Sequence, residues 1–382
     1  MNNLSQLGSY TLLCIASLTI MVGSLVAPGL LSISSALGVA DHASWLITLP
    51  ALGAILFAPL AGKLIDKYGA YPSLVVGLIL YGAVGAAVFW LHGSALVFLN
   101  RILLGAVTAL VMASGTVLIS QWYVASARLA MIAKQGMAIE LGGVIFLFLG
   151  GQFAAIHWGL PLSLYLIAWL FLAMLLMWVP KHAPTLIEPT DSSTTAPHSR
   201  NGLPLKGVYI VTLLAMATFF SAFILLPKSM TAHGFTEQVI GYLLAFISLI
   251  AVVTAHFIPK VVPRIGEVKL LAIAFVAYAL AYLCFSYSHE LMVLVLGAIF
   301  SGIGFGFSIP LLNHLTVQKS PASVRGRNLS YFTMAVFSGQ FLTSFMEFLS
   351  SGITTIFIFC LLTASTIAAA LFISEKRLQR TT

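Results

Sequence analysis

The segment GKLIDKYG, residues 62–69, forms a short polar break between two long apolar runs. A related segment, PKVVPRIG at residues 259–266, stands between another pair of apolar runs 197 residues later. The second copy keeps basic residues and the final glycine, but it lacks the first glycine and the aspartate. The chain is therefore predicted to contain a degenerate internal repeat, in which each copy joins two helices.

The composition around these breaks is that of a membrane protein. Of the 382 residues, 60% are hydrophobic and only 7% are charged, whereas a soluble domain carries about 25% charged residues. Such a chain cannot cover one large core with a polar surface, which excludes an ordinary soluble enzyme. The breaks predict about twelve transmembrane helices, at residues 10–36, 43–61, 72–91, 95–120, 135–155, 160–179, 207–227, 238–258, 269–287, 291–316, 328–349 and 352–373. The first is expected to be retained, because no basic residue precedes it as in a signal peptide.

The positions of the basic residues account for the net charge of +8. With the N-terminus inside, all lysines and arginines except Arg101 and Lys228 fall in predicted inner segments. The positive-inside rule then predicts an even number of spans with both termini in the cytoplasm, in a bacterial inner (cytoplasmic) membrane. Anionic membrane lipid is the expected partner of these charges, and nucleic acid is not.

A long polar stretch divides the chain in two. Residues 180–206 include PTDSSTTAP, a composition typical of a flexible linker. The predicted domains are a six-helix bundle at 1–180, a cytoplasmic linker at 181–206 and a second six-helix bundle at 207–382. Two parallel half-repeats are typical of secondary transporters that work by alternating access.

Motifs of other functional classes do not occur in the sequence. It contains no His-Glu-x-x-His, no Gly-x-Ser-x-Gly and no P-loop. The three cysteines, Cys14, Cys284 and Cys360, lie inside apolar runs and are interpreted as packing residues. No enzymatic activity, cofactor or metal site is therefore expected.

The first polar break carries a family resemblance. The pattern Gly-x-Leu-Ala-Asp-Arg-x-Gly-Arg-Arg is matched at Gly62, Leu64, Asp66, Lys67 and Gly69, while Ala70 and Tyr71 replace the usual basic pair. In this context the chain resembles the major facilitator superfamily over nearly its whole length, and specifically its twelve-helix drug/proton antiporter branch.

The resemblance implies a conformational latch made by this segment. Asp66 is then expected to contact the cytoplasmic start of the eleventh span, near Asn328, and to hold the two halves in the outward-facing state. The glycines permit a sharp turn, and the carboxylate suits the positive end of a helix dipole. The alternative is a topological anchor with a solvated aspartate.

Two ionisable residues within predicted spans are candidates for proton coupling. Arg101 lies in the fourth span, where the resemblance implies a role in proton coupling or in the electrostatics of the cavity; the alternative is snorkelling to the outer headgroups. Glu140, in the fifth span, is the leading titratable site, because a carboxyl group in a low dielectric can exchange protons near neutral pH. The alternative is pairing with Lys134 or Arg128 at the inner interface. Glu347, at the outer end of the eleventh span, is expected to be interfacial.

Small and polar residues mark further positions. In the fifth span, Gly142, Gly150 and Gly151 match part of the antiporter pattern Gly-x-x-x-Gly-Pro-x-x-Gly-Gly, with Phe146 and Leu147 at its Gly-Pro positions, and are expected to pack closely at the interface between the halves. In the second half, Asn313, His314 and Gln340 resemble positions that line the central cavity and are possible substrate contacts. Helix-helix hydrogen bonding is the alternative. Pro28 and Pro310 are expected to kink their helices.

The combined interpretation is a secondary active transporter. The resemblance favours proton-coupled export of small amphiphilic or drug-like compounds by a monomer. The sequence leaves open an exporter of a specific metabolite or siderophore, and a solute:proton symporter.

Overall fold

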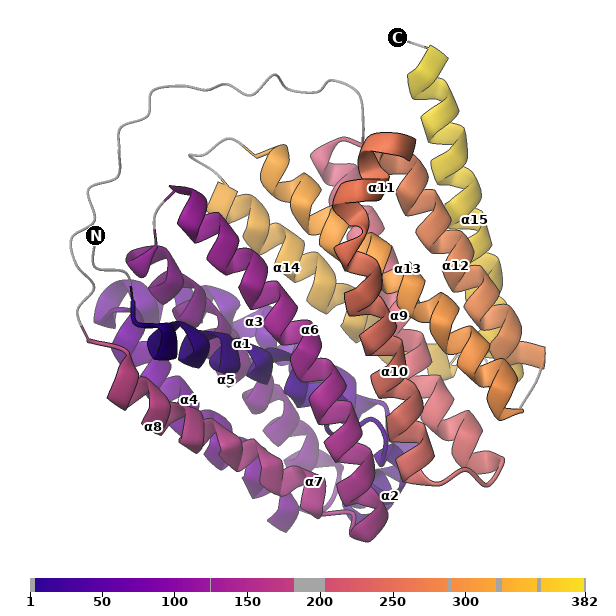
Figure 1. The fold of residues 1–382 in the computed structure, drawn as a ribbon. Helices are drawn as coiled ribbons and strands as arrows, with labels where there is room; N and C mark the ends of the chain where they lie inside the picture. The colour runs from indigo at the N-terminus through magenta and orange to yellow at the C-terminus, as the bar shows by residue number, and fades with distance from the viewer. Residues whose placement is uncertain are drawn as a thin grey trace. The chain divides into compact units, whose positions relative to one another are not determined.

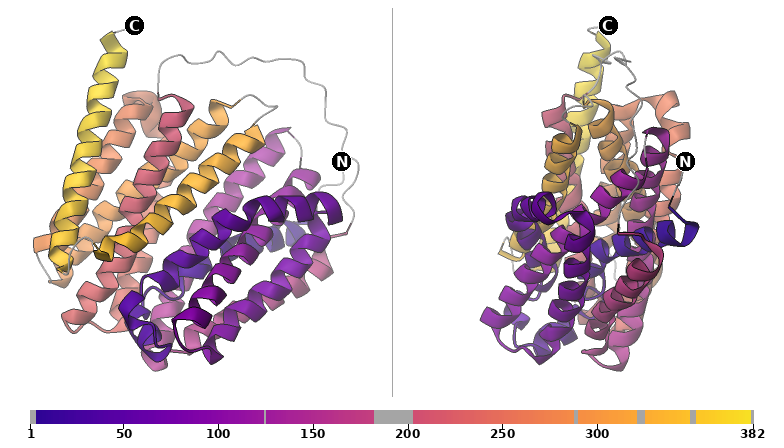
Figure 2. Two further views of the ribbon diagram at one scale, coloured as in Figure 1. Left: turned by 180° about the vertical axis from the view of Figure 1, so that it is seen from behind. Right: turned by 90° about the vertical axis from the view of Figure 1, so that its left-hand side faces the viewer.

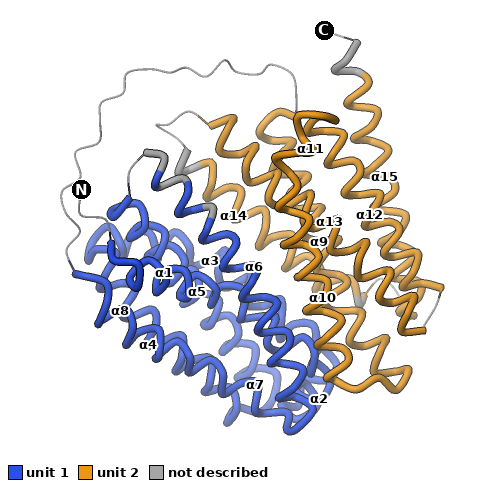
Figure 3. The backbone as a smooth tube through the Cα atoms, in the orientation of Figure 1, with its two compact units in different colours: residues 1–193 blue, residues 194–382 orange. Residues whose placement is uncertain are grey.

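The computed structural model describes residues 4–123, 125–181, 203–287, 290–320, 325–348 and 352–380. The described chain is helical and divides into two compact units, residues 1–193 and 194–382 (Figure 3). Most of the linker predicted at 181–206 lies outside the described residues, and the second bundle already begins at Leu205.

Unit 1 is a bundle in which the first helix packs on four others. Its elements are α1 (Gln6–Ser24), α2 (Leu30–Ala36), η1 (Ala40–His42), α3 (Trp45–Tyr68), α4 (Ala70–Ala87), η2 (Val88–Trp90), α5 (Ser94–Trp122), α6 (Ala125–Ile156), α7 (Leu160–Ser163), η3 (Leu164–Leu166) and α8 (Ile167–Trp178) (Figure 1). Helix α1 contacts α3, α5, α6 and α8, while α5 also contacts α3, α4 and α6. Helices α1 and α5 therefore make the most connections within this bundle.

Unit 2 repeats this arrangement. Its elements are α9 (Leu205–Ala232), α10 (Glu237–His256), α11 (Ile258–Ile265), α12 (Glu267–Tyr287), α13 (Leu291–Gln318), α14 (Arg325–Leu342), η5 (Thr343–Phe348) and α15 (Ile353–Arg380). Helix α9 contacts α13 and α14, and α13 also contacts α10 and α12. The C-terminal end of α15 extends beyond the other helices of its unit in both views of Figure 2.

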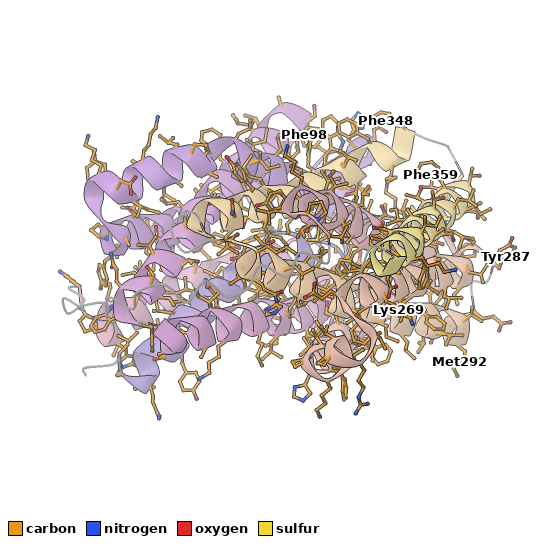
Figure 4. The ribbon with its side chains drawn as sticks, turned by 90° about the horizontal axis from the view of Figure 1, so that it is seen from above. Phe98, Lys269, Tyr287, Met292, Phe348 and Phe359 are labelled. Atoms are coloured by element: carbon orange, nitrogen blue, oxygen red, sulfur yellow. The ribbon has the colours of Figure 1, made fainter. Side chains whose placement is uncertain are left out.

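Eleven helices in the described part of the chain are long and apolar enough to cross a membrane. They include the sixth predicted span, which is built from α7, η3 and α8. Large apolar side chains such as Tyr287, Met292 and Phe359 are 76%, 78% and 45% exposed and point away from the helices of unit 2 (Figure 4). Such a surface is stable only in lipid, because water would not solvate it.

Two of the predicted spans differ from the structure. The first, predicted as continuous over 10–36, ends its α-helix at Ser24, and a separate helix α2 follows the break that contains Pro28. The eleventh, predicted at 328–349, is not among the eleven apolar helices: α14 ends at Leu342 and continues as the 3-10 helix η5. Proline cannot donate the backbone hydrogen bond of a continuing helix, which explains the first difference.

The two polar breaks adopt the same backbone turn. Gly69 joins α3 to α4 with φ 90° and ψ 159°, and Gly266 joins α11 to α12 with φ 87° and ψ 157°. Each glycine N–H donates to the carbonyl oxygen four residues earlier, Ile65 at 2.8 Å and Val262 at 2.9 Å. This region of backbone conformation is accessible essentially only to glycine.

The repeat extends to helix packing at the same offset of 197 residues. A methyl group at Gly105 of α5 would collide with the carbonyl oxygen of Pro50 in α3. A methyl group at Gly302 of α13 would lie 2.6 Å from the carbonyl oxygen of Ile247 in α10. Small residues at helix contacts let backbones approach closely in a membrane, and here they do so at equivalent points of the two units.

Candidate functional site

Arg101 lies in the second turn of α5 and is only 1% exposed. Its Nη2 donates a hydrogen bond of 3.0 Å to the Oδ1 of Asn100, and its Nη1 donates one of 3.3 Å to the hydroxyl of Tyr165. The guanidinium carbon lies 5.5 Å from the centre of the Tyr165 ring, a cation–π distance. Its Nε atom is buried and has no hydrogen-bond partner among the described residues. Arg101 thus lies inside unit 1, and the alternative of a side chain extended to an exposed surface does not hold.

Two tyrosines extend this network to the first helix. The hydroxyl of Tyr165, in η3, donates to the carbonyl oxygen of Val22 at 2.9 Å, and that of Tyr81, in α4, donates to the carbonyl oxygen of Leu18 at 2.6 Å. The two rings meet edge to face, 5.9 Å apart. A side chain at Gly85 would collide with the ring of Tyr165, so the glycine leaves room for it. The network connects α1, α4, α5 and η3.

Neutral groups surround the positive charge. In the described part of the chain, no carboxylate lies within ion-pair distance of Arg101, whose hydrogen-bond partners are an amide and a phenol. A buried cation without a neutralising partner is costly and is usually retained for function. The sequence analysis identified Arg101 but missed Asn100, Tyr81 and Tyr165. For Asn100 the sequence offered a signal, because an asparagine lies next to an arginine within an apolar run.

Glu140 occupies the middle of the 32-residue helix α6 and is half-buried. Two residues later, a methyl group at Gly142 would lie 2.6 Å from the Cβ of Ser17 in α1. Two residues correspond to about 200° around a helix, so Glu140 lies on the side of α6 away from α1. Gly136, one turn earlier on the same side as Glu140, has no atom within 4 Å of where its Cβ would be.

The side chain of Glu140 therefore faces away from α1. Within the described residues it forms no ion pair with Lys134 or with Arg101, and the side chain of Arg128 is not described.

The glycines of α6 pack within unit 1. A methyl group at Gly150 would lie 2.5 Å from the carbonyl oxygen of Leu25 in α1, on the same contact as Gly142, and Gly151 is also buried. The close contacts that the structure gives to Gly142 and Gly150 are thus with α1, and packing of these glycines at the interface between the halves stays a prediction. They bring α6 close to α1 because α6 crosses its own first helix, and Gly339 of α14 approaches Leu213 of α9 in the same way.

The latch motif is helical up to its last residue. Helix α3 continues through Tyr68, so Gly62 lies within the helix and only Gly69 forms the turn; the expected loop with a bend at Gly62 is wrong. Asp66 and Lys67 are exposed in the last turn of α3. Asn328, the expected partner of Asp66, is buried in unit 2, where its Nδ2 donates to the Oγ of Ser320 at 2.8 Å. The contact between Asp66 and the start of α14 stays a prediction.

The polar residues of the second half do not form one site. Asn313 and His314 lie within two turns of the end of α13, whereas Gln340 lies near the far end of α14. Because α14 runs back from the end of α13, Asn313 and Gln340 are separated by on the order of 15 Å along the helices. Asn313 and Gln340 are half-buried and His314 is exposed.

Unit 2 contains an aromatic cluster that the sequence analysis missed. Phe219, Phe220 and Phe223 of α9 and Phe305 of α13 are all between 4% and 6% exposed. The ring centres of Phe219 and Phe305 are 4.0 Å apart, and those of Phe219 and Phe223 are 4.8 Å apart. Phenylalanines one and four positions apart in an apolar run were the signal in the sequence. In the part of the chain that the structure describes, no group of His, Cys, Asp or Glu side chains is arranged to hold a metal ion.

An apolar helical chain with two repeated bundles and a buried charge has the architecture of a polytopic membrane transporter. Its sequence matches the profile of the Major Facilitator Superfamily over residues 12–344, and the chain belongs to that family.

Curated relatives and solved structures agree with this assignment. The multi-drug resistance efflux pump PmrA of Streptococcus pneumoniae is 25% identical over 296 residues, 74% of this chain and 72% of PmrA. Multidrug resistance protein 2 of Bacillus subtilis is 22% identical over 304 residues, 76% of each chain. A nucleoside transporter NupG structure superposes with a TM-score of 0.75 at 15% identity, covering 96% of this chain and 99% of NupG. A POT family transporter bound to 5-aminolevulinic acid gives 0.76 at 13% identity, covering 97% and 96%. The solved structures support the fold, and the chain is a multi-pass membrane transporter.

Proposed function

We propose that this transporter exports small amphiphilic or drug-like compounds by alternating access, in exchange for protons. The relatives named as multidrug efflux pumps align over about three quarters of the chain, which supports export of this class of compound. The proposed location is a bacterial inner membrane, with both termini in the cytoplasm and the chain acting as a monomer.

Glu140 is the proposed proton carrier, and its placement is the observation that carries the proposal. A half-buried carboxyl group in the middle of an apolar helix, on the face away from α1, meets a different environment when the helix is exposed to the other side of the membrane. Its proton affinity then differs between the two states, which is what converts a pH gradient into net transport.

Arg101 is the proposed fixed charge of the transport pathway. Its guanidinium is held by Asn100 and Tyr165 and is not neutralised by a carboxylate of the described residues. A permanent buried cation lowers the cost of bringing negative charge nearby, whether on an anionic cargo or on a deprotonated carboxylate. In this conformation the side chain is covered, so this effect acts through the electric field and does not require contact with the cargo.

The aromatic cluster of α9 and α13 suits an apolar cargo. These rings are covered in this conformation, so the proposal places their contact with a flat or amphiphilic molecule in another state of the transport cycle, where they supply apolar area without a fixed charge. The dispersed positions of Asn313, His314 and Gln340 argue against one polar binding site built from these three residues.

The test is transport by purified protein in vesicles with an imposed pH gradient. Glu140→Gln keeps the shape of the side chain but fixes it in a neutral form. We expect the variant to bind an amphiphilic dye and to exchange it down its own gradient, while accumulation driven by the pH gradient is abolished. Glu347→Gln, which changes a membrane acid expected at the interface, serves as the matched control and should retain accumulation.

Full accumulation by Glu140→Gln would refute Glu140 as the proton carrier. The orientation of the gradient decides the direction of transport, because an exporter concentrates the dye on the side that corresponds to the cell exterior. Accumulation on the cytoplasmic side would identify a solute:proton symporter. If the protein transported only one metabolite or siderophore in a compound panel, the proposal of a drug-like cargo would be refuted in favour of a specific exporter.

A further inference from the structure

Helix α11 is a short amphipathic helix that forms its own element between α10 and α12. Its apolar residues occur at helical positions one, four, five and eight, and all are half-buried: Ile258, Val261, Val262 and Ile265. The remaining four are exposed: Pro259, Lys260, Pro263 and Arg264. The first set lies on one face and the second on the other, as a period of 3.6 residues requires.

Little of the protein covers this helix. None of its residues is buried, and its main contacts are with the adjoining helices α10 and α12. Figure 1 shows α11 at the end of unit 2, where α10 stops and α12 starts. The apolar face is therefore only partly covered by α10 and α12, and burying the rest of its apolar surface in lipid would be favourable.

The surroundings of the helix are basic. Lys260, Arg264 and Lys269 are exposed, and Lys269, in the first turn of α12, is labelled in Figure 4. The ammonium group of Lys260 lies 5.8 Å from the ring centre of Phe257, and no carboxylate of the described residues forms an ion pair with these three cations. The one acidic residue between Phe257 and Lys269 is Glu267, which is half-buried at the start of α12.

The equivalent segment of unit 1 is not a separate helix and is not free of acidic residues. Residues 62–68 continue α3 without a break and carry the acidic Asp66. In unit 2, α10 ends at His256, and the new helix contains two prolines and no acid. The repeat has thus diverged from a continuous helix end with an acid to a separate helix with a basic face.

We propose that α11 lies in the membrane interface as a docking surface for anionic phospholipid, with its apolar face among the acyl chains and Lys260, Arg264 and Lys269 on the headgroup phosphates. An amphipathic helix with cations on its polar face binds in this way, through buried apolar area and attraction to anionic lipid. This proposal and the proposed function share one assumption, which is that the end of unit 2 that carries α11 faces the cytoplasm.

Lipid retention by the purified full-length protein tests the proposal without measuring transport. Native mass spectrometry gives the ratio of bound phosphatidylglycerol to bound phosphatidylcholine when both are supplied equally. Each cation near an anionic lipid surface contributes about fivefold in affinity at low ionic strength. Lys260→Gln with Arg264→Gln should therefore reduce the preference for phosphatidylglycerol by more than tenfold, whereas added inorganic phosphate should not displace the lipid.

The matched control removes the same charge elsewhere. Lys206→Gln with Lys376→Gln changes two exposed lysines, on α9 and α15, that do not belong to an amphipathic helix. We expect this pair to reduce the preference by less than threefold. Equal effects of the two pairs, or no preference in the unchanged protein, would overturn the proposal. All four positions are exposed, so folding can be checked by size-exclusion chromatography without a confounding loss of packing.

Discussion

Replacement of Arg101 by methionine tests whether the charge is needed for transport or for the stability of the fold. A charged side chain in a membrane helix costs about 2.5–3.5 kcal/mol on insertion scales. Against this stand two hydrogen bonds, worth about 0.6 kcal/mol each in a membrane, and a cation–π contact of about 1 kcal/mol. The stabilising contacts thus nearly offset the cost of burial, and no ion pair with a carboxylate of the described residues adds to them.

Arg101→Met should therefore leave the free energy of unfolding within about 1 kcal/mol of that of the unchanged protein. The methionine fills much of the volume, and the lost partner of the Asn100 Oδ1 offsets part of the gain from removing the charge. For a unit of this size the midpoint of thermal unfolding should move by at most about 4 °C. Transport driven by a pH gradient should nevertheless fall by more than tenfold.

The assay combines thermal unfolding in detergent with transport in vesicles. Lys228→Met removes the other basic residue that lies outside the predicted cytoplasmic segments and should retain transport. A fall of the unfolding midpoint by more than about 8 °C would show that Arg101 mainly holds Tyr165 and Asn100 in place. Normal transport by a stable Arg101→Met variant would refute the proposed role of the charge.

Three further predictions concern the turn, the latch and the topology. Gly69→Ala and Gly266→Ala should each destabilise the protein by about 1–3 kcal/mol in thermal unfolding, because both glycines have positive φ; Gly62→Ala, within α3, should be neutral or stabilising. Asp66→Asn should shift distances between spin labels on the two halves towards the inward-facing state and impair transport, and unchanged distances with normal transport would leave only the anchor role. A cysteine at Ser193, in a background without other cysteines, should resist an impermeant thiol reagent in intact cells, and labelling from outside would refute the cytoplasmic linker.

The architecture was predictable because the apolar runs and the basic residues between them recur along the whole chain. Apolar runs of about 20 residues and basic residues between them define spans without any knowledge of packing. Helix ends were less predictable. Residues 63–68 contain no strong helix breaker, so α3 continues through them until Gly69 turns the chain. The kink at Pro28 was expected, but whether it bends or separates the helix depends on what α1 and α2 pack against.

The candidate site was only partly predictable. Arg101 and Glu140 are conspicuous because charges are rare in apolar runs. The partner of Arg101 is Tyr165, 64 residues later, and no spacing in the sequence encodes that contact. It arises because α4 approaches η3 closely at Gly85, which places the tyrosine ring beside α5. Gly142 has the same limit: a small residue predicts a close approach between helices, but it does not predict that the approaching helix is α1.

The two units share helix-helix contacts that stabilise the fold, but they differ in the charged residues proposed to act in transport. Tyr81 of α4 donates to the carbonyl oxygen of Leu18 in α1, and Tyr282 of α12 donates to that of Thr218 in α9. These bonds hold the third membrane helix of each unit to the first, so they belong to the scaffold. Arg101 has no counterpart, since position 298, which is 197 residues later, is an alanine.

The second helix-end motif has diverged as well, because unit 2 has a basic helix where unit 1 has Asp66. Alternating access needs two units that move alike, whereas coupling and a latch need groups that act once per cycle. The glycines that recur at the offset of 197 residues serve the first requirement. The unrepeated charges at Asp66, Arg101 and Glu140 are therefore the positions at which substitution should change transport while leaving the fold intact.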